Sequence, residues 1–252
     1  MSPEFNEMGP KGRNLEDRMA VITGGGSGIG AAVALALARE GAGLCLIGRR
    51  LEALESVASR ARDMGVPAVC YRADLSVPRG QLELTQGVRQ SLHRIDFLIQ
   101  SAALHKAGPV EQSSLAEFDE LYQTNVRAPL ALAQALLPML KEHKGQIVFI
   151  NSSSGITAKP MSAQYDATKH ALKAIADSLR GEVNSYGVRV LSVYPGRTAT
   201  DMQERLHRIE DKSYHSELLL QPADVASVIV NALLLPRTAE VTDIHIRPMI
   251  KT

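Results

Sequence analysis

The sequence predicts an α/β domain built on a doubly wound parallel β-sheet of about seven strands, with helices on both faces. Two observations carry this prediction. Short apolar runs alternate with helical patterns along the chain, and many of these runs are apolar on consecutive residues, as strands buried on both faces require. The predicted strands span 19–23, 43–48, 68–73, 96–101, 146–151, 188–194 and 243–248.

Helical patterns fill the intervals between the predicted strands and supply the crossovers that a parallel sheet needs. The predicted helices span 30–40, 50–65, 78–93, 115–143, 162–187 and 222–235. The segment 198–221 is the least regular part of the chain, and it interrupts the alternation just after the sixth strand. We expect a loop here that covers a cleft.

The chain shows no internal repeat, low-complexity linker or break in composition, which predicts a single domain over 15–252. Residues 1–14 form a polar extension without an apolar signal core, so secretion is not predicted. The first five residues of this extension resemble a cloning remnant, with Met8 as the natural start.

Composition narrows the classes of partner. Of the 252 residues 45% are hydrophobic and 22% charged, the net charge is +1, and Lys and Arg form no long block. A nucleic acid or an anionic membrane surface is therefore not an expected partner. No apolar run approaches the roughly 18 residues of a transmembrane helix. Cys45 and Cys70 lie in apolar runs and are expected to be packed thiols in a reducing cytoplasm, and no His/Cys/Asp spacing predicts a metal.

A glycine-rich turn, "TGGGSGIG" at 23–30, links the first predicted strand to an alanine-rich helix. Glycine lets the backbone approach a pyrophosphate, and the first helical turn offers free N–H groups and its positive dipole end. Glycine as simple turn punctuation is the weaker alternative, because the turn follows a strand and begins a βαβ unit. The predicted cofactor contacts in this turn are Gly24, Gly26, Ser27, Gly28, Ile29 and Gly30.

The end of the second predicted strand indicates which dinucleotide binds. A site for NAD places an acidic residue about twenty positions after the glycine turn, where it binds the ribose hydroxyls. This chain has Arg49 nineteen residues beyond Gly30, flanked by Gly48 and Arg50. Arginine suits a 2′-phosphate, so NADP(H) is predicted in preference to NAD(H). The alternative is a solvated arginine at the start of a helix.

The stretch "YDATK" at 165–169 places Tyr165 and Lys169 four residues apart on a predicted helix, and hence on one face. By itself this pattern fits an ordinary half-buried helix surface. Three serines at 152–154, at the end of the fifth predicted strand, precede the tyrosine by 11 to 13 residues. Together with the glycine turn, this order of Ser, Tyr and Lys resembles the classical short-chain dehydrogenases/reductases, whose Rossmann fold would cover essentially all of 15–252.

The resemblance implies a role for each catalytic position. The family's serine lies thirteen residues before its tyrosine, which selects Ser152, and this serine would hydrogen-bond the substrate oxygen. Tyr165 would be the general acid/base. Lys169 would bind the nicotinamide ribose and, with the oxidised nicotinamide, lower the pKa of the phenol from its usual value near 10. Asn125 would help to hold a proton-relay water.

The resemblance also implies contacts with the cofactor outside the glycine turn. These are Asp74, Leu75, Ser101, Ala102, Ala103, Tyr165, Lys169, Pro195, Gly196, Thr198 and Thr200. The chain departs from the family at 100–103, where "QSAA" replaces the usual "NNAG", and this puts the local cofactor contacts in question. Its ending also differs from the family's common one and resembles members with broad carbonyl or 3-hydroxy-acid substrates. His105 and Lys106, which follow the altered motif, are placed where they could touch a substrate, but as loop residues they are interpreted as solvated.

The sequence thus predicts an NADP-dependent oxidoreductase that interconverts a carbonyl and a secondary alcohol. A non-catalytic dinucleotide-binding sensor or scaffold on the same fold is the main alternative, and a dehydratase or epimerase that uses the bound cofactor is a third. The family also implies a homodimer or homotetramer joined through the helices near 117–142 and 165–185.

Overall fold

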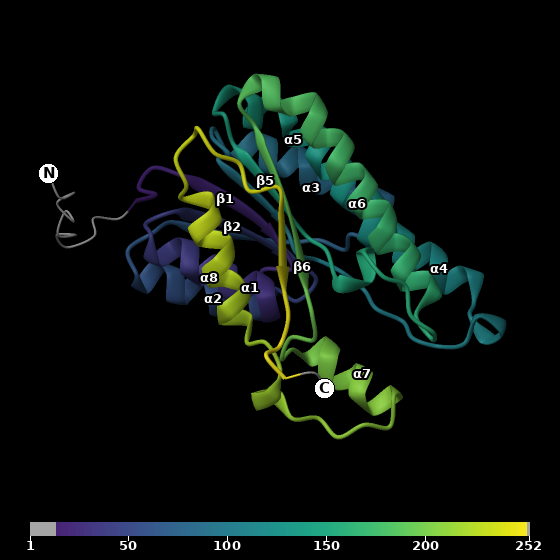
Figure 1. The fold of residues 1–252 in the computed structure, drawn as a ribbon. Coiled ribbons are helices and arrows are strands. Elements are labelled where there is room, and N and C mark those ends of the chain that lie inside the picture. The colour runs from purple at the N-terminus through teal and green to yellow at the C-terminus, as the bar shows by residue number, and fades with distance from the viewer. Residues whose placement is uncertain (1–13, 251–252) are drawn as a thin grey trace, which may run out of the picture.

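The computed structural model describes residues 14–250 and contains one seven-stranded sheet in the order β3-β2-β1-β4-β5-β6-β7 (Figure 1). All neighbouring strands in this sheet are parallel. The strands are β1 Met19–Thr23, β2 Gly43–Gly48, β3 Ala68–Arg72, β4 Phe97–Gln100, β5 Gln146–Ile150, β6 Arg189–Pro195 and β7 Asp243–Ile246. The predicted fold class is therefore confirmed.

The α-helices of the described residues are α1 Gly28–Arg39, α2 Leu51–Asp63, α3 Pro78–Ser91, α4 Leu115–Tyr122, α5 Ala128–Glu142, α6 Ala163–Val183, α7 Asp201–Ile209 and α8 Pro222–Leu233. Six of them form two layers, one on each face of the sheet. Helices α1, α2 and α8 pack on one face, and α3, α5 and α6 pack on the other (Figure 1). This arrangement is the doubly wound architecture that the alternation predicts.

Successive residues of the central strands feed two separate cores. In β1, Ile22 packs with one helix layer while Val21 packs with the other. Because both faces are covered, each central strand must be apolar at nearly every position. The two cysteines lie in these strands as free thiols, with Cys45 in one core and Cys70 packed against the other. Burial raises the pKa of each thiol to about 12.

Two segments differ from the predicted pattern. The helix predicted over 115–143 is interrupted by π-helical Gln123–Arg127, which separates α4 from α5. The segment 198–221 contains α7, a nine-residue helix, where a loop was predicted. The Thr200 hydroxyl accepts a hydrogen bond from the backbone N–H of Gln203 at the start of α7, so this helix has a proper N-cap.

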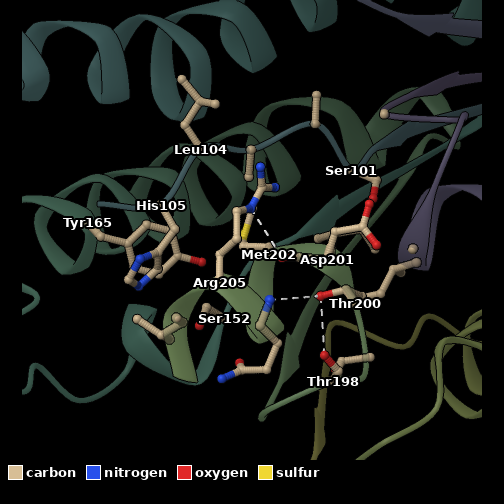
Figure 2. A pocket seen from close by; sticks show the side chains of 18 of the residues that line it. Ser101, Leu104, His105, Ser152, Tyr165, Thr198, Thr200, Asp201, Met202 and Arg205 are labelled. Atoms are coloured by element: carbon tan, nitrogen blue, oxygen red, sulfur yellow. Dashed lines mark hydrogen bonds between the residues drawn. The ribbon is translucent and has the colours of Figure 1, made fainter. Parts of the chain in front are cut away.

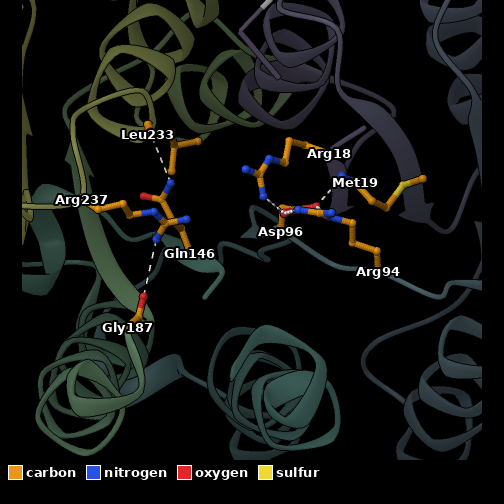
Figure 3. Close-up of polar contacts among 8 residues, drawn as sticks. All are labelled: Arg18, Met19, Arg94, Asp96, Gln146, Gly187, Leu233 and Arg237. Carbon is orange, nitrogen blue, oxygen red and sulfur yellow. Dashed lines mark hydrogen bonds and ion pairs between the residues drawn. The ribbon is translucent and has the colours of Figure 1, made fainter. Parts of the chain in front are cut away.

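The amino-terminal edge of the sheet is held by a cluster of charged side chains (Figure 3). The Asp96 carboxylate, just before β4, accepts hydrogen bonds from Arg18, Arg94 and the backbone N–H of Met19. Nearby, the side chain of Gln146 donates to the Leu233 carbonyl and so ties β5 to α8. These contacts fix the edge that lies opposite the glycine turn.

The predicted extension 1–14 lies outside the described residues except for Asn14, whose side chain donates a hydrogen bond to Glu40. Leu15, the first residue of the predicted domain, is buried against the core that contains α1. Within residues 14–250, the structure has no helix of the length and apolarity needed to cross a membrane.

Candidate active site

A cavity of about 980 Å³ runs along the carboxyl ends of the strands. It lies where the strand order reverses, between β1 and β4, which is where open α/β sheets bind ligands. The structure brings nearly all of the predicted site residues to its wall. These are Gly24, Gly26, Ser27, Gly28, Ile29, Arg49, Arg50, Asp74, Leu75, Ser101, Ala102, Ala103, Ser152, Tyr165, Lys169, Pro195, Gly196, Thr198 and Thr200. Gly30 and Asn125 do not line it.

The glycine turn between β1 and α1 depends on backbone conformations that other residues rarely adopt. Gly24 has φ +67° and Gly28 has φ +54°. Gly30 acts by packing, since a Cβ atom at this position would lie 2.3 Å from the Gly24 carbonyl oxygen. A side chain at Gly30 would therefore push the turn out of shape, although Gly30 itself does not reach the cavity.

The far end of the cavity carries positively and negatively charged side chains that could contact a ribose, namely Arg49, Arg50 and Asp74. Arg49 and Arg50 are exposed and follow β2, and neither forms an ion pair with another described residue. Asp74, which follows β3, accepts hydrogen bonds from the backbone N–H and the hydroxyl of Ser76. Although burial acts to raise the pKa of Asp74, these hydrogen bonds and the positive charge of Arg49 lower it. Arg49 is thus free to contact an anion.

At the other end, Tyr165 and Lys169 point from the first turns of α6 toward the end of β5. Both side chains are buried, and the Lys169 Nζ donates a hydrogen bond of 3.0 Å to the Ile150 carbonyl. The Lys169 Nζ lies 5.7 Å from the centre of the Tyr165 ring. Ser152 follows β5, and its hydroxyl accepts a hydrogen bond from the backbone N–H of Ser154. Figure 2 shows Ser152 beside Tyr165 at the cavity wall.

Burial controls the ionisation of both α6 side chains. It raises the pKa of Tyr165 to about 12, with a hydrogen bond from Ser152 opposing the shift and the charge of Asp166 reinforcing it. It lowers the pKa of Lys169 to about 8. Desolvation of the phenolate is thus the largest of the effects that the protein's own groups exert on this pKa. The lowering predicted from Lys169 together with the oxidised nicotinamide concerns the cofactor-bound site and stays a prediction. At neutral pH Tyr165 carries its proton.

Asn125 lies in the π-helical segment, and its side chain joins two parts of the site. The Asn125 amide accepts from the backbone N–H of Leu104 and donates to the Leu104 carbonyl, at 2.8 and 2.9 Å. It also donates to the hydroxyl of Thr168, which in turn donates to the Tyr165 carbonyl. The buried amide thus ties the loop after β4 to the helix that carries Tyr165, whereas its predicted role toward a water stays a prediction.

The altered motif after β4 is braced by side chains. The Thr23 hydroxyl accepts hydrogen bonds from the backbone N–H groups of Ser101 and Ala102, both at 3.1 Å. Gln100 donates from its buried side chain to the Pro129 carbonyl at the start of α5. Gln100 therefore links the sheet to α5, and Ser101, Ala102 and Ala103 all remain at the cavity wall.

Two contributors to the cavity were not among the predicted site residues. The first is His105, whose ring centre lies 4.1 Å from that of Tyr165, with an angle of 46° between the planes. Lys106 fits its interpretation as a surface residue, since it pairs with Glu117. The second is α7, from which Asp201, Met202 and Arg205 line the cavity across from Tyr165 (Figure 2).

Helix α7 is fastened to the end of β6 by polar contacts. Arg197, next to the Pro195-Gly196 turn, forms an ion pair of 2.7 Å with Glu210 and contacts the buried ring of His207. Glu210 also pairs with Lys212. Among the described residues no group of three or more His, Cys, Asp or Glu side chains has the arrangement of a metal site.

Comparisons with known proteins agree with this fold. Residues 18–211 match the model of the short chain dehydrogenase family. The glycine betaine reductase ATRR of Emericella nidulans is 36% identical over 95% of this chain, which spans 19% of that reductase. An uncharacterized oxidoreductase of Staphylococcus epidermidis is 31% identical over 93% of this chain and 99% of its own length.

Solved structures give the same result. An alcohol dehydrogenase from Thermococcus sibiricus, complexed with 5-hydroxy-NADP, superimposes with a TM-score of 0.85, at 26% identity, over 93% of this chain and 98% of that chain. A metagenomic short-chain oxidoreductase in complex with NADP gives 0.81 at 28% identity, over 94% of this chain and 100% of that chain. The fold and the comparisons thus define the class of the protein as an oxidoreductase. The chain belongs to the short-chain dehydrogenase family.

Proposed function

We propose that the protein is an NADP-dependent oxidoreductase that interconverts a carbonyl and a secondary alcohol, with Asn125, Ser152, Tyr165 and Lys169 as its active site. One observation carries the proposal. A phenol, a hydroxyl and an ammonium group, from Tyr165, Ser152 and Lys169, meet at one end of a cavity whose other end is the glycine turn. This is the arrangement that a general acid/base beside a dinucleotide requires.

The residues of the cavity fit a dinucleotide. Gly24, Gly26 and Gly28 line the cavity beside the first turn of α1, whose backbone N–H groups would face a pyrophosphate. Arg49 and Asp74 would face the adenosine end, and Thr198 the nicotinamide end. When bound, the nicotinamide supplies or takes the hydride, and the protein positions the reacting groups.

The chain's own contribution to carbonyl reduction is a proton. Tyr165 is protonated at neutral pH, so its hydroxyl can donate that proton to the carbonyl oxygen as the carbon receives the hydride. Ser152 would hydrogen-bond the same oxygen and stabilise the charge that develops on it. Lys169, beside the phenol ring, would stabilise the phenolate that remains. In alcohol oxidation the same groups would act in reverse.

The preference for NADP(H) is supported by Arg49, which is exposed at the cavity and has no ion-pair partner among the described residues. Similar structures were crystallised with NADP and, in one case, with NAD+, so the proposed preference rests on Arg49 and not on the fold. A guanidinium group is well suited to a 2′-phosphate because it donates two parallel hydrogen bonds.

The alternative of a non-catalytic sensor or scaffold does not explain the buried residues at the other end of the cavity. A sensor needs the glycine turn but has no use for a buried lysine beside a buried tyrosine, an arrangement that costs stability. The decisive experiment is a panel of ketones, aldehydes and 3-hydroxy acids, followed by the absorbance of NADPH. The proposal is supported if the wild type turns over a panel member and Tyr165→Phe abolishes that turnover. A wild type that binds NADPH tightly and turns over no member supports the sensor.

We also propose that the protein is a homodimer or homotetramer in the cytoplasm. The free thiols of Cys45 and Cys70 suit a reducing compartment. Small side chains occupy most of the exposed face of α6 and would let a second helix approach closely, namely Ala163, Ala167, Ala174, Ser178 and Gly181, with His170 among them. Light scattering at micromolar concentration should give twice or four times the 27.2 kDa of one chain. A clean monomer mass would contradict this part of the proposal.

A further inference from the structure

His105 lies where a substrate would meet the proposed acid/base. Its ring packs on the Tyr165 ring, with 4.1 Å between the ring centres, and both side chains line the cavity (Figure 2). The two nitrogen atoms of this ring form no hydrogen bond with any described residue. A half-buried imidazole without a protein partner at a cavity wall is free to bind a ligand.

The position of this ring is fixed by the same network that fixes Tyr165. Asn125 holds both the backbone N–H and the carbonyl of Leu104, the residue before His105. The same amide donates to Thr168, whose hydroxyl donates to the Tyr165 carbonyl. Because one side chain braces both backbones, the imidazole and the phenol keep their spacing, which is a condition for selective recognition.

The ring is neutral at neutral pH. Burial and the positive charge of Lys169 lower the pKa of His105, while the charges of Asp166 and Glu210 oppose this effect. A neutral imidazole presents one N–H donor and one acceptor nitrogen.

The contact with the phenol places His105 next to the reacting end of a substrate. The oxygen that receives the proton must lie within about 2.6–3.2 Å of the Tyr165 hydroxyl. Because the His105 ring packs at 4.1 Å from the phenol ring and both side chains line the cavity, a substrate whose carbonyl oxygen meets this hydroxyl also lies close to the imidazole.

We propose that His105 is a substrate-recognition residue whose ring N–H donates a hydrogen bond to a second oxygen, carried by the carbon next to the reacting carbonyl. The preferred substrates are then carbonyl compounds oxygenated at that adjacent carbon, such as 1,2-diketones. This inference rests on the proposed function, since it places the reacting oxygen at Tyr165.

The test compares two compounds with the same skeleton, 1-phenylpropane-1,2-dione and propiophenone, reduced with NADPH. The dione carries the second oxygen and propiophenone does not. His105→Phe keeps an aromatic ring against Tyr165 but removes the N–H. Because one neutral hydrogen bond is lost, His105→Phe should lower kcat/KM for the dione by about three- to tenfold. The kcat/KM for propiophenone should change by less than about twofold. His105→Gln restores an N–H donor and should recover part of the loss.

Lys106→Met is the matched control, because Lys106 lies on the same loop and pairs with Glu117. It should leave both kcat/KM values unchanged. The inference is overturned if His105→Phe and His105→Gln, both folded by thermal unfolding, keep the wild-type ratio between the two compounds. A wild type that reduces neither compound, nor any member of the wider carbonyl panel, contradicts the proposed function itself, and the inference falls with it.

Discussion

A buried charged side chain lies at each end of the parallel strands, and the two differ in how many hydrogen-bond partners they have. At the amino edge, Asp96 is 2% exposed, and its carboxylate accepts hydrogen bonds from Arg18, Arg94 and the backbone of Met19 (Figure 3). At the carboxyl edge, Lys169 is also 2% exposed, and its ammonium group donates to the single carbonyl of Ile150. One charge is surrounded by partners and the other is left with spare donors.

The pKa values follow this difference. Burial acts to raise the pKa of Asp96, but the hydrogen bonds from Arg94 and Arg18 outweigh it and lower the pKa. Burial lowers the pKa of Lys169 to about 8 because no carboxylate compensates the desolvated charge. A charge with all its partners inside the protein stabilises the fold, whereas one with spare donors at a cavity wall is available to a ligand. Substitutions at the two edges should therefore separate stability from turnover.

The largest expected effect is on turnover at the carboxyl edge. Tyr165→Phe removes the proton-donating oxygen and retains the ring, so kcat should fall by at least about a thousandfold. NADPH affinity and the unfolding temperature should change little, because the ring that packs against His105 remains. Steady-state kinetics, fluorescence titration of NADPH and thermal unfolding measure the three quantities. Tyr186→Phe, on an exposed tyrosine beyond α6, is the control. A Tyr165→Phe enzyme that keeps most of its kcat would remove Tyr165 from its proposed role.

Lys169→Met should affect activity and stability in opposite directions. The substitution removes a buried charge and keeps most of the side-chain volume, so the free energy of unfolding at neutral pH should rise by about 1 kcal/mol. Turnover and NADPH affinity should both fall by at least about tenfold. The control is Lys173→Met on the same helix, where the lysine is half-exposed and paired with Asp177. Loss of stability together with undiminished turnover would show that Lys169 is a structural residue.

Asp96→Asn should show the reverse pattern at the amino edge. It leaves two arginines without their acceptor charge, and the free energy of unfolding should fall by about 2 kcal/mol, since the arginines remain partly solvated. Turnover should be unchanged. Chemical denaturation and steady-state kinetics measure the two quantities.

The pH dependence of Asp96→Asn gives a further check. Since the folded-state pKa of Asp96 is lowered, its stabilisation is complete above the unfolded value, near 4, and is lost as pH falls through the folded-state value. The difference in unfolding free energy between wild type and variant should therefore be constant near neutrality and shrink below about pH 4. Asp177→Asn, at an exposed ion pair, is the control. If the difference in unfolding free energy between wild type and Asp96→Asn persists below pH 4, the loss of stability comes from packing and not from the carboxylate charge.

Features that depend on local sequence could be predicted. The central strands are buried on both faces, so Val21 and Ile22 must both be apolar, and this is visible without a structure. The glycine turn is dictated by backbone sterics, as the left-handed φ of Gly24 demonstrates. The spacing of Tyr165 and Lys169 follows from the period of a helix.

Features that depend on contacts between distant segments could not be predicted. The setting of His105 is fixed by Asn125 through Leu104, over a separation of 21 residues. The π-helical segment that contains Asn125 carries no signal of its own in the sequence. Helix α7 was missed for a different reason. Its signals were present, with Thr200 as N-cap and Asp201 in the first turn, but the irregular surroundings concealed them.

The smallest expected effect concerns a charge at the carboxyl edge that has no ion-pair partner among the described residues. Arg49 is exposed and lies near Asp74, whose pKa it helps to lower. A hydrogen bond to a phosphate contributes on the order of 1.5–3 kcal/mol, and solvent exposure favours the lower end of that range. Arg49→Asp should therefore weaken NADPH by about tenfold and strengthen NADH relative to it, because a carboxylate repels the 2′-phosphate and accepts the ribose hydroxyls. Titrating both cofactors at low and high salt measures the change, and the wild-type preference for NADPH should narrow as salt rises. Arg60→Asp, on the exposed side of α2, should alter neither affinity. Equal wild-type affinities for NADPH and NADH would show that Arg49 is a solvated side chain without a role in cofactor selection.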